Sequence, residues 1–444
     1  MNNELFNDKF KKLFDEYRIK LNNKSFLLAV SGGIDSMCMF DLFLKHKINF
    51  SVCHCNFDLR GEDSKKDLEF VKKISKSNGI NFYYKTMDVK KDSINNKISL
   101  QMSARNLRYV WFNELLEKKK IDFLCTAHHL NDNAETVIYN LTKPTGYRGI
   151  RGIKVFRDKI FRPLMNFTKK ELKNYAKSNN LLWRQDSSND SSKYIRNKIR
   201  LNVIPHLEEI NPSFERSIMN TSSRFFEFEK FIKFSLTEIK KECIEYLEDG
   251  LKINFSLWRK KDKNFFLLKE YLIQFGFNYD QSNNIIKLTK GISGKYFESK
   301  KYRLFIERDF LFISEKINIK KLNIDVNEKG NYKFFRNIIK FEIINFSDFS
   351  FIKDPKIAQI DFEKIKFPLT IRKWKNGDSF RPYGLNGTKK VSDFLIDNKV
   401  PSYIKIFQGV VLFKNKIVWL IGHQIDDKFK VKDKTRKVLR ISIN

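Results

Sequence analysis

An apolar run that breaks abruptly into two glycines constrains this chain more than any other feature. The stretch 26–40 reads FLLAVSGGIDSMCMF, so that Ser31, Gly32 and Gly33 separate two apolar segments. A buried strand, a glycine turn and a helix in this order direct the free N–H groups and the dipole of the helix toward an anion. Glycines also let the backbone approach that anion closely. The stretch therefore predicts a phosphate pocket, and its alternative is a tight strand-to-helix turn capped by Ser36.

Short apolar runs alternate with helical patterns through the first third of the chain. Strands are expected at 26–30, 50–55, 82–86 and 123–127, and helices at 36–46, 63–78 and 99–119. This alternation predicts an α/β fold, a parallel doubly wound sheet of Rossmann-like type with helices on both faces. Ligands bind at the carboxyl ends of such strands, where polar residues cluster in this sequence. We therefore expect the chemistry at that edge of the sheet.

The chain has 444 residues, which exceeds one ordinary core and predicts several domains. We expect a catalytic domain at 1–215, a helical, Lys- and Phe-rich middle domain at 216–325, and a small C-terminal domain at 326–444. The last has mostly short alternating runs, which predict β structure with a helix near Val391–Asn398 and a hairpin turn in FKNK. The middle and C-terminal domains are expected to bind the polyanionic partner.

The net charge of +34, from 86 basic and 52 acidic residues, favours nucleic acid as that partner. AT-rich coding DNA would also enrich Lys, Asn, Phe and Ile, so part of the charge has a compositional alternative. No run of 18 apolar residues and no apolar leader occurs, which predicts a cytoplasmic protein without membrane contact. The five cysteines form no CxxC pair, which argues against disulfides, zinc and iron–sulfur clusters.

Basic and histidine side chains follow the second and third expected strands. His54 and Arg60, in HCNFDLRGEDS, are expected at the rim of the phosphate pocket. In LQMSARNLRYVWF, Arg105 and Arg108 are three apart and share a helix face. Arginines on one face suit a phosphate or carboxylate clamp, and a solvated face is the alternative.

Two carboxylates open the helix after the fourth expected strand. In TAHHLNDNAETV, Asp132 and Glu135 are three apart and follow His128. Such a pair can cap the helix or hold Mg²⁺ against phosphates. The phosphate loop upstream favours Mg²⁺. Farther on, the stretch 160–207 is dense in Arg, Asp and Asn, and five of its residues are expected to face a substrate: Asp186, Asn189, Arg196, Asn197 and Arg200.

Six motifs in a fixed order resemble those of the tRNA(Ile)-lysidine synthase family, within the PP-loop ATP pyrophosphatase superfamily. They are SGGxDS, HxNxxLR, ARxxRY, TAHHxxDxxET, RPL and the segment ending in YxRNxIR, and they span about 25–207. The resemblance recurs more weakly at 357–423. The chain departs from the usual pattern at Phe57, where a second histidine is usual, at Asn131, where an aspartate is frequent, and at KPTG, 143–146.

The resemblance implies roles for individual residues. ATP phosphates would be bound by the loop together with three further side chains: Ser31, Gly32, Gly33, Ile34, Asp35, Ser36, His54, Arg105 and Arg108. Mg²⁺ would be held by Asp35, Asp132 and Glu135, which with Arg196 would form the catalytic set. Substrate would be bound by residues from the whole chain: Arg60, His128, Asp186, Asn189, Asn197, Arg200, Arg372, Arg381, Lys389 and Lys390.

The family's activity is an ATP-dependent ligation that forms a carbon–nitrogen bond. By resemblance, ATP adenylates O2 of the wobble cytidine in a CAU-anticodon tRNA(Ile), with release of pyrophosphate. The ε-amine of free L-lysine then attacks C2 and AMP leaves, so that the tRNA reads AUA in place of AUG. The resemblance also makes a homodimer an expectation.

Three other functions stay open at this stage. A PP-loop enzyme that thiolates tRNA commonly uses paired cysteines, which the sequence lacks. A glutamine-fed amidotransferase would need a glutaminase domain or partner, and none is recognisable. A non-catalytic RNA-binding protein with a relic nucleotide fold would not depend on Asp35 or Asp132.

Overall fold

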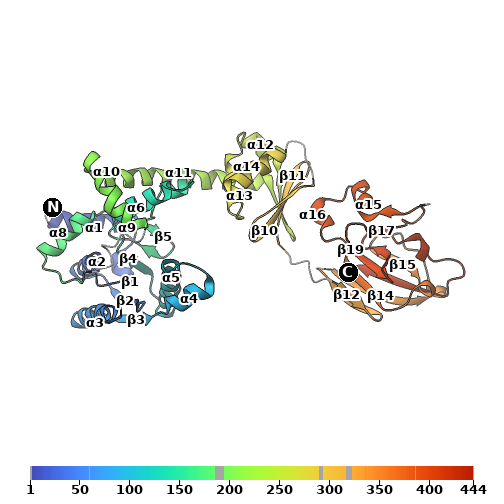
Figure 1. The fold of residues 1–444 in the computed structure, drawn as a ribbon, viewed down its shortest axis with the longest axis horizontal. Coiled ribbons are helices and arrows are strands. Elements are labelled where there is room, and N and C mark those ends of the chain that lie inside the picture. The colour runs from blue at the N-terminus through green and yellow to red at the C-terminus, as the bar shows by residue number, and fades with distance from the viewer. Residues whose placement is uncertain are drawn as a thin grey trace. The chain divides into compact units, whose positions relative to one another are not determined.

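The computed structural model describes residues 3–59, 61–185, 195–289, 294–316, 323–335, 337–385 and 387–443. It divides the chain into two compact units, Met1–Phe231 and Ile232–Asn444 (Figure 1). In the part of the chain that is described, no helix combines the length and apolarity that a membrane span requires. The domain boundaries expected near 215 and 325 stay predictions.

A six-stranded sheet in the order β3-β2-β1-β4-β6-β5 forms the centre of the first unit. Neighbouring strands from β3 to β6 pair in parallel, and only β5 runs antiparallel to its neighbour. The strands are β1 (Phe26–Ala29), β2 (Phe50–Asn56), β3 (Phe82–Thr86), β4 (Phe123–Thr126), β5 (Phe156–Arg157) and β6 (Ile160–Phe161). The predicted parallel α/β sheet is confirmed, with its four predicted strands within a residue of their expected ends.

Helices connect and flank these strands. They are α1 (Asn3–Glu16), α2 (Ile34–Lys45), α3 (Glu62–Ser77), α4 (Val89–Asn96), α5 (Leu100–Lys118), α6 (Leu130–Leu141), α7 (Tyr147–Ile150), α8 (Lys169–Ser178), α9 (Ile195–Lys198) and α10 (Ile204–Ile210). A π-helical turn, Ile199–Val203, joins α9 to α10. The long helix α11 (Phe214–Cys243) continues from the first unit into the second.

Strand β1 shows why both faces of the sheet are covered. Phe26 and Leu28 belong to a core cluster that includes residues of α1, α2 and α8, whereas Leu27 belongs to a second cluster built mainly from α5. Successive strand side chains point to opposite faces, so an unbroken apolar run needs an apolar layer on each side. These two layers bury β1 on both faces, and polar residues stand only beyond its ends, with the glycine loop at the carboxyl end.

The middle part of the chain is helical as expected but also contains a sheet that the sequence analysis did not anticipate. Helices α12 (Phe255–Lys261), α13 (Phe266–Ile273) and α14 (Tyr279–Leu288) accompany an antiparallel sheet in the order β7-β8-β11-β10-β9. Its strands are β7 (Ile244–Leu247), β8 (Gly250–Asn254), β9 (Tyr296–Glu298), β10 (Tyr302–Ile306) and β11 (Phe310–Glu315).

The C-terminal part contains two four-stranded antiparallel sheets, in the orders β12-β16-β19-β20 and β13-β14-β21-β15. One apolar cluster, which includes the fully buried Trp419, takes residues from both sheets. The strands are β12 (Asn323–Val326), β13 (Gly330–Phe334), β14 (Asn337–Asn345), β15 (Ile357–Asp361), β16 (Leu369–Lys373), β19 (Gly409–Phe413), β20 (Lys416–Leu420) and β21 (Lys437–Ile443), with a small β17–β18 pair (Ser379–Phe380, Lys389–Lys390).

Two local predictions for this part are confirmed. Helix α15 (Val391–Asp397) lies where a helix was expected, and α16 (Ser402–Lys405) follows it. The FKNK segment turns between β19 and β20, with positive φ at both Lys414 and Asn415. Two central residues with positive φ are typical of the tight hairpin turn whose twist matches the flanking strands.

Candidate active site

The glycine loop between β1 and α2 has the geometry of an anion cradle. Gly32 adopts φ +91°, which residues with a side chain rarely adopt, and a Cβ there would also lie 3.4 Å from Phe70 and Val71. Ser36 Oγ donates to the Gly33 carbonyl at 2.8 Å and accepts from the Ser31 amide at 3.2 Å. The Ser36 hydroxyl therefore closes the turn while the first amides of α2 face the loop. The tight turn capped by Ser36 and the predicted phosphate pocket are therefore compatible.

A cavity of about 310 Å³ opens beside this loop, at the carboxyl ends of β1 and β2. Its size lies at the lower end for small-molecule sites and suits a nucleoside. Its lining comes from both strand ends, from α3 and from α5: Ala29, Val30, Ser31, Cys53, His54, Cys55, Asn56, Phe57, Leu59, Ser64, Asp67, Arg108 and Phe112. The loop and two side chains predicted to bind nucleotide, those of His54 and Arg108, thus border one space.

Contacts within the cavity wall orient these two predicted side chains. The ring nitrogen Nδ1 of His54 lies 2.9 Å from the Val30 carbonyl, and burial lowers the pKa of His54. The imidazole is therefore neutral at neutral pH, with Nδ1–H donating to that carbonyl. The Arg108 guanidinium lies 5.2 Å from the centre of the Phe57 ring. Phe57, where the family usually has histidine, is thus a cation–π partner for a cavity-lining arginine.

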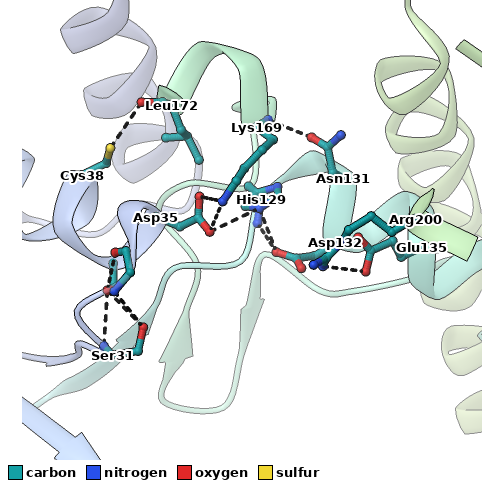
Figure 2. A network of polar contacts seen from close by, with 12 residues as sticks. Ser31, Asp35, Cys38, His129, Asn131, Asp132, Glu135, Lys169, Leu172 and Arg200 are labelled. Carbon is teal, nitrogen blue, oxygen red and sulfur yellow. Dashed lines mark hydrogen bonds and ion pairs between the residues drawn. The ribbon is translucent and has the colours of Figure 1, made fainter. Parts of the chain in front are cut away.

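Two carboxylates from different helices converge on one histidine (Figure 2). Asp35 Oδ2, on the first turn of α2, lies 3.7 Å from His129 Nε2, and Asp132 Oδ2, on the first turn of α6, lies 3.5 Å from the same atom. Asp132 Oδ2 also accepts the His129 backbone amide at 2.9 Å. The predicted capping role of Asp132 is thus present, and the cap holds its carboxylate at the edge of the sheet.

The charges of this cluster are mutually stabilised. Burial alone would raise the pKa of Asp35, but the contact with His129 and the charges of His129 and Lys169 outweigh it and lower the pKa to about 2. Burial would also raise the pKa of Asp132, but the charges of His129 and His128 outweigh burial and lower it. Against its burial, the two acids raise the pKa of His129. Both acids are therefore ionised at neutral pH.

Glu135 does not join these two acids. Its two carboxylate oxygens accept from Arg200 Nε at 2.5 Å and from a terminal nitrogen of Arg200 at 3.1 Å, and only 2% of the Glu135 side chain is exposed. Both oxygens of this buried carboxylate are thus committed to one bidentate arginine contact. Asp35 differs because, although both of its oxygens accept from Lys169, its side chain is 27% exposed and can be reached by a ligand. We therefore correct the expected role of Glu135: the structure favours positioning of Arg200 over metal ligation.

Two carboxylates of the site fit Mg²⁺. Among the described residues, no group of three or more acidic, histidine or cysteine side chains could hold a metal ion. Mg²⁺ commonly uses one or two carboxylates and takes its other ligands from phosphates and water. Asp35 and Asp132, ionised and converging beside the glycine loop, fit that pattern.

Other predicted residues gather around the cluster. His128 Nδ1 lies 2.9 Å from Thr126 Oγ1, and burial lowers the pKa of His128 to about 4. Arg105, on α5, is near enough for its charge to act on His128. Arg196 donates to Thr136 Oγ1 at 2.7 Å, so α9 and the π-turn both contact α6.

The remaining predictions have separate outcomes. Arg60, Asp186 and Asn189 lie outside the described residues, and Asn197 is half-buried on α9. The four basic residues Arg372, Arg381, Lys389 and Lys390 belong to the second unit. The Arg372 guanidinium donates to both carboxylate oxygens of Asp378 at 2.7 and 2.9 Å, which favours a structural role over a tRNA contact. Lys389 forms an ion pair with Asp397.

Sequence reasoning missed three residues that complete the site. Lys169 contacts Asp35, His129 joins the two acids, and the Arg184 amide donates to the Gly32 carbonyl at 3.0 Å while its guanidinium pairs with Asp67. The HH pair and the basic residues after RPL were the available signals. Neither signal identifies which residue far away in the chain each side chain contacts.

Comparisons with known proteins agree with this geometry. Three family models match in chain order: a PP-loop domain at 2–207, a TilS substrate binding domain at 246–317 and a TilS substrate C-terminal domain at 369–443. The tRNA(Ile)-lysidine synthase of Parabacteroides distasonis is 32% identical and that of Bacteroides thetaiotaomicron 31% identical, each covering 96% of this chain and 97% of its own length.

A solved structure resembles the fold only loosely. The U34-tRNA thiolase NcsA from Methanococcus maripaludis is 19% identical, covers 50% of this chain and 79% of its own, and has a TM-score of 0.44. That score adds nothing to the assignment. The sequence similarity over nearly the full length shows that the chain belongs to the tRNA(Ile)-lysidine synthase family.

Proposed function

We propose that this chain ligates free L-lysine to C2 of the wobble cytidine in a CAU-anticodon tRNA(Ile), at the expense of ATP. The observation that carries the proposal is the nearly full-length similarity to tRNA(Ile)-lysidine synthases, which includes all three domains. The ionised acids beside the glycine loop are consistent with it. Because the substrate is a tRNA, we also expect a cytoplasmic location, and the homodimer stays a prediction.

The first step is adenylation of the base. Cytosine O2 attacks the α-phosphorus of ATP, and the bond to the bridging oxygen breaks, so that pyrophosphate leaves. Amides of the loop around Gly32 and Gly33 would stabilise the departing phosphates, because donors aimed at developing charge lower the barrier. Removing one such donor typically costs a factor of about 10²–10³ in rate. Bound Mg²⁺ would neutralise phosphate charge and would be held by Asp35 and Asp132.

The second step exchanges oxygen for nitrogen at C2. The deprotonated ε-amine of lysine attacks C2, the C2–O2 bond breaks, and AMP leaves carrying O2. Adenylation is needed because C2 is a urea-like carbonyl whose oxygen is otherwise a very poor leaving group. Arg200, held by Glu135, and Arg196, held by Thr136, lie on the face of α6 next to Asp132 and are candidates to bind a substrate carboxylate or phosphate.

Labelled lysine tests the proposal directly. The full-length protein, ATP and Mg²⁺ should incorporate labelled lysine into a CAU-anticodon transcript and release AMP and pyrophosphate in equal amounts. A transcript that differs only in a GAU anticodon is the control and should remain unlabelled. Labelling of both transcripts or of neither, or release of ADP and orthophosphate, would contradict the proposal.

The thiolation alternative is disfavoured by the cysteines. Cys38, Cys53, Cys125 and Cys243 are buried, and burial raises the pKa of the half-buried Cys55 to about 12. Burial thus disfavours the thiolate, which is the reactive form. A variant with all five cysteines replaced by alanine or serine should retain lysine incorporation, whereas a thiolase would lose its activity.

A further inference from the structure

Lys169 makes a close ionic contact with the first turn of the helix that follows the glycine loop. Its Nζ lies 2.6 Å from each carboxylate oxygen of Asp35, and its side chain is 45% exposed. Figure 2 shows the side chain reaching from α8 across to the start of α2. A lysine ammonium has three donors, and Asp35 uses two of them. Among the described residues, the structure records no acceptor for the third.

The backbone that carries Lys169 is firmly anchored. Its amide donates to Asn131 Oδ1 at 2.8 Å, and Asn131 Nδ2 donates to Glu215 at 2.6 Å. The start of α8 is closed by a capping box between Thr168 and Glu171. An amide side chain can accept on one side and donate on the other, whereas the aspartate frequent at position 131 in the family would present oxygen to the Glu215 carboxylate. The Asn131 side chain thus links the Lys169 backbone to Glu215.

Glu171 strengthens the same anchor with contacts from two other helices. Its carboxylate accepts from Lys9 on α1 at 3.0 Å and from Arg216 on α11 at 2.7 Å. The backbone at the start of α8 is therefore held in place, whereas the Lys169 side chain can change its conformation. A long, flexible side chain on a fixed base suits a point charge that must follow a polyanion.

The charges around the glycine loop explain why a cation is needed there. The Asp35 carboxylate, paired with Lys169, stands on the first turn of α2, the same turn whose amides face the loop. A triphosphate bound by those amides would meet the negative charge of Asp35 at close range. Lys169 offsets that charge at the carboxylate itself and keeps a donor that a phosphate oxygen can accept.

We propose that Lys169 is a phosphate-binding residue whose ammonium bridges Asp35 and the β- or γ-phosphate of ATP. This inference rests on the proposed function, because it assumes that the glycine loop receives the triphosphate. It concerns ground-state binding, so it can be measured without tRNA and without lysine. A charge-assisted hydrogen bond of this kind is worth about 10–100-fold in affinity.

Equilibrium binding of ATP and AMP to the full-length protein, with Mg²⁺ in fixed excess, tests the inference. For Lys169→Met, the Kd for ATP should rise about 10–100-fold while the Kd for AMP changes less than about twofold, since AMP lacks the β- and γ-phosphates. Lys169→Arg should recover most of the ATP affinity because it retains the positive charge. Lys170→Met is the matched control, an exposed lysine one position along the same helix, and should bind ATP like the wild type.

Each result decides the inference. Unchanged ATP affinity in Lys169→Met would overturn it, as would equal losses of ATP and AMP affinity, which would indicate damage to the loop. An equal loss of ATP affinity in Lys170→Met would also overturn it, because the effect would then be one of general charge. Failure of the proposed function has a different signature: the wild-type protein would bind ATP but incorporate no lysine.

Discussion

The acids and bases of the first unit and those of the C-terminal part are used in different ways. At the carboxyl ends of the parallel strands, Asp35 and Asp132 come from separate helices and converge on His129. In the antiparallel C-terminal part, basic residues pair within their own surroundings, as Arg372 does with Asp378 six positions on. A parallel sheet brings all its strand ends to one edge, whereas antiparallel hairpins do not. Residue type alone therefore does not mark a functional site.

The largest effect is expected on the stability of the C-terminal part, when its core is disrupted and the parallel sheet is left unchanged. Trp419→Ala should lower the stability of the C-terminal part by about 3–5 kcal/mol, because it empties a fully buried position shared by both sheets. Hydrogen exchange resolved by segment should show loss of protection in β12–β21 and little change in β1–β6. ATP affinity should stay within twofold. Matched loss of protection in the parallel sheet would show that the two regions do not act separately.

A substitution at the predicted metal site of the first unit should slow the reaction while the chain still folds. Asp35→Asn should lower the rate of AMP release by about 10²–10³-fold, since it removes a charge from the predicted metal and phosphate site. The variant should stay folded but unfold at a lower temperature, because it also loses the ion pair of Asp35 with Lys169. Asp41→Asn, on the same helix but paired with Lys45 and Tyr175, is the control and should retain most of the activity. Comparable losses in both variants would argue against a special role for Asp35.

The Glu135–Arg200 pair gives a smaller effect that sharpens its assignment. A double-mutant cycle with Glu135→Gln and Arg200→Met should give a coupling energy of about 1 kcal/mol in unfolding, because Glu135 is buried but 40% of the Arg200 side chain is exposed. If Glu135 positions Arg200, the two single variants should lose similar amounts of kcat. The double variant should then lose only slightly more kcat than either single variant. An additive loss, with a raised Mg²⁺ requirement in Glu135→Gln alone, would restore Glu135 as a metal ligand.

The smallest effect is expected for Arg372. Arg372→Met should reduce tRNA affinity less than about threefold and should leave the salt dependence of tRNA binding unchanged, because its guanidinium is committed to Asp378. Lys390→Met, at an exposed position, is the comparison. If Lys390 contacts a phosphate, this substitution should reduce the salt dependence of tRNA binding. A reduced slope for Arg372→Met would return Arg372 to the tRNA-binding set.

Much of the fold followed from local pattern. The strands at 26–30, 50–55, 82–86 and 123–127 were predicted because parallel strands covered on both faces read as short apolar runs. The sheet of the middle part was missed because its strands are short and several of their residues are exposed, as in β7 and β9. Such strands exist through pairing partners far away in the chain, such as β8 with β11, and local sequence does not record that pairing.

The sequence by itself determined the family and the glycine loop and named Asp35, Asp132 and Glu135 as candidate acids, because these depend on short local motifs and on their order. Only the tertiary structure decided what each acid contacts. Asp35 meets Lys169 across 134 positions, and Glu135 meets Arg200 across 65. An ionised side chain can pair with any opposite charge that lies within a few ångströms. Which charges lie that close depends on how the helices pack on the sheet.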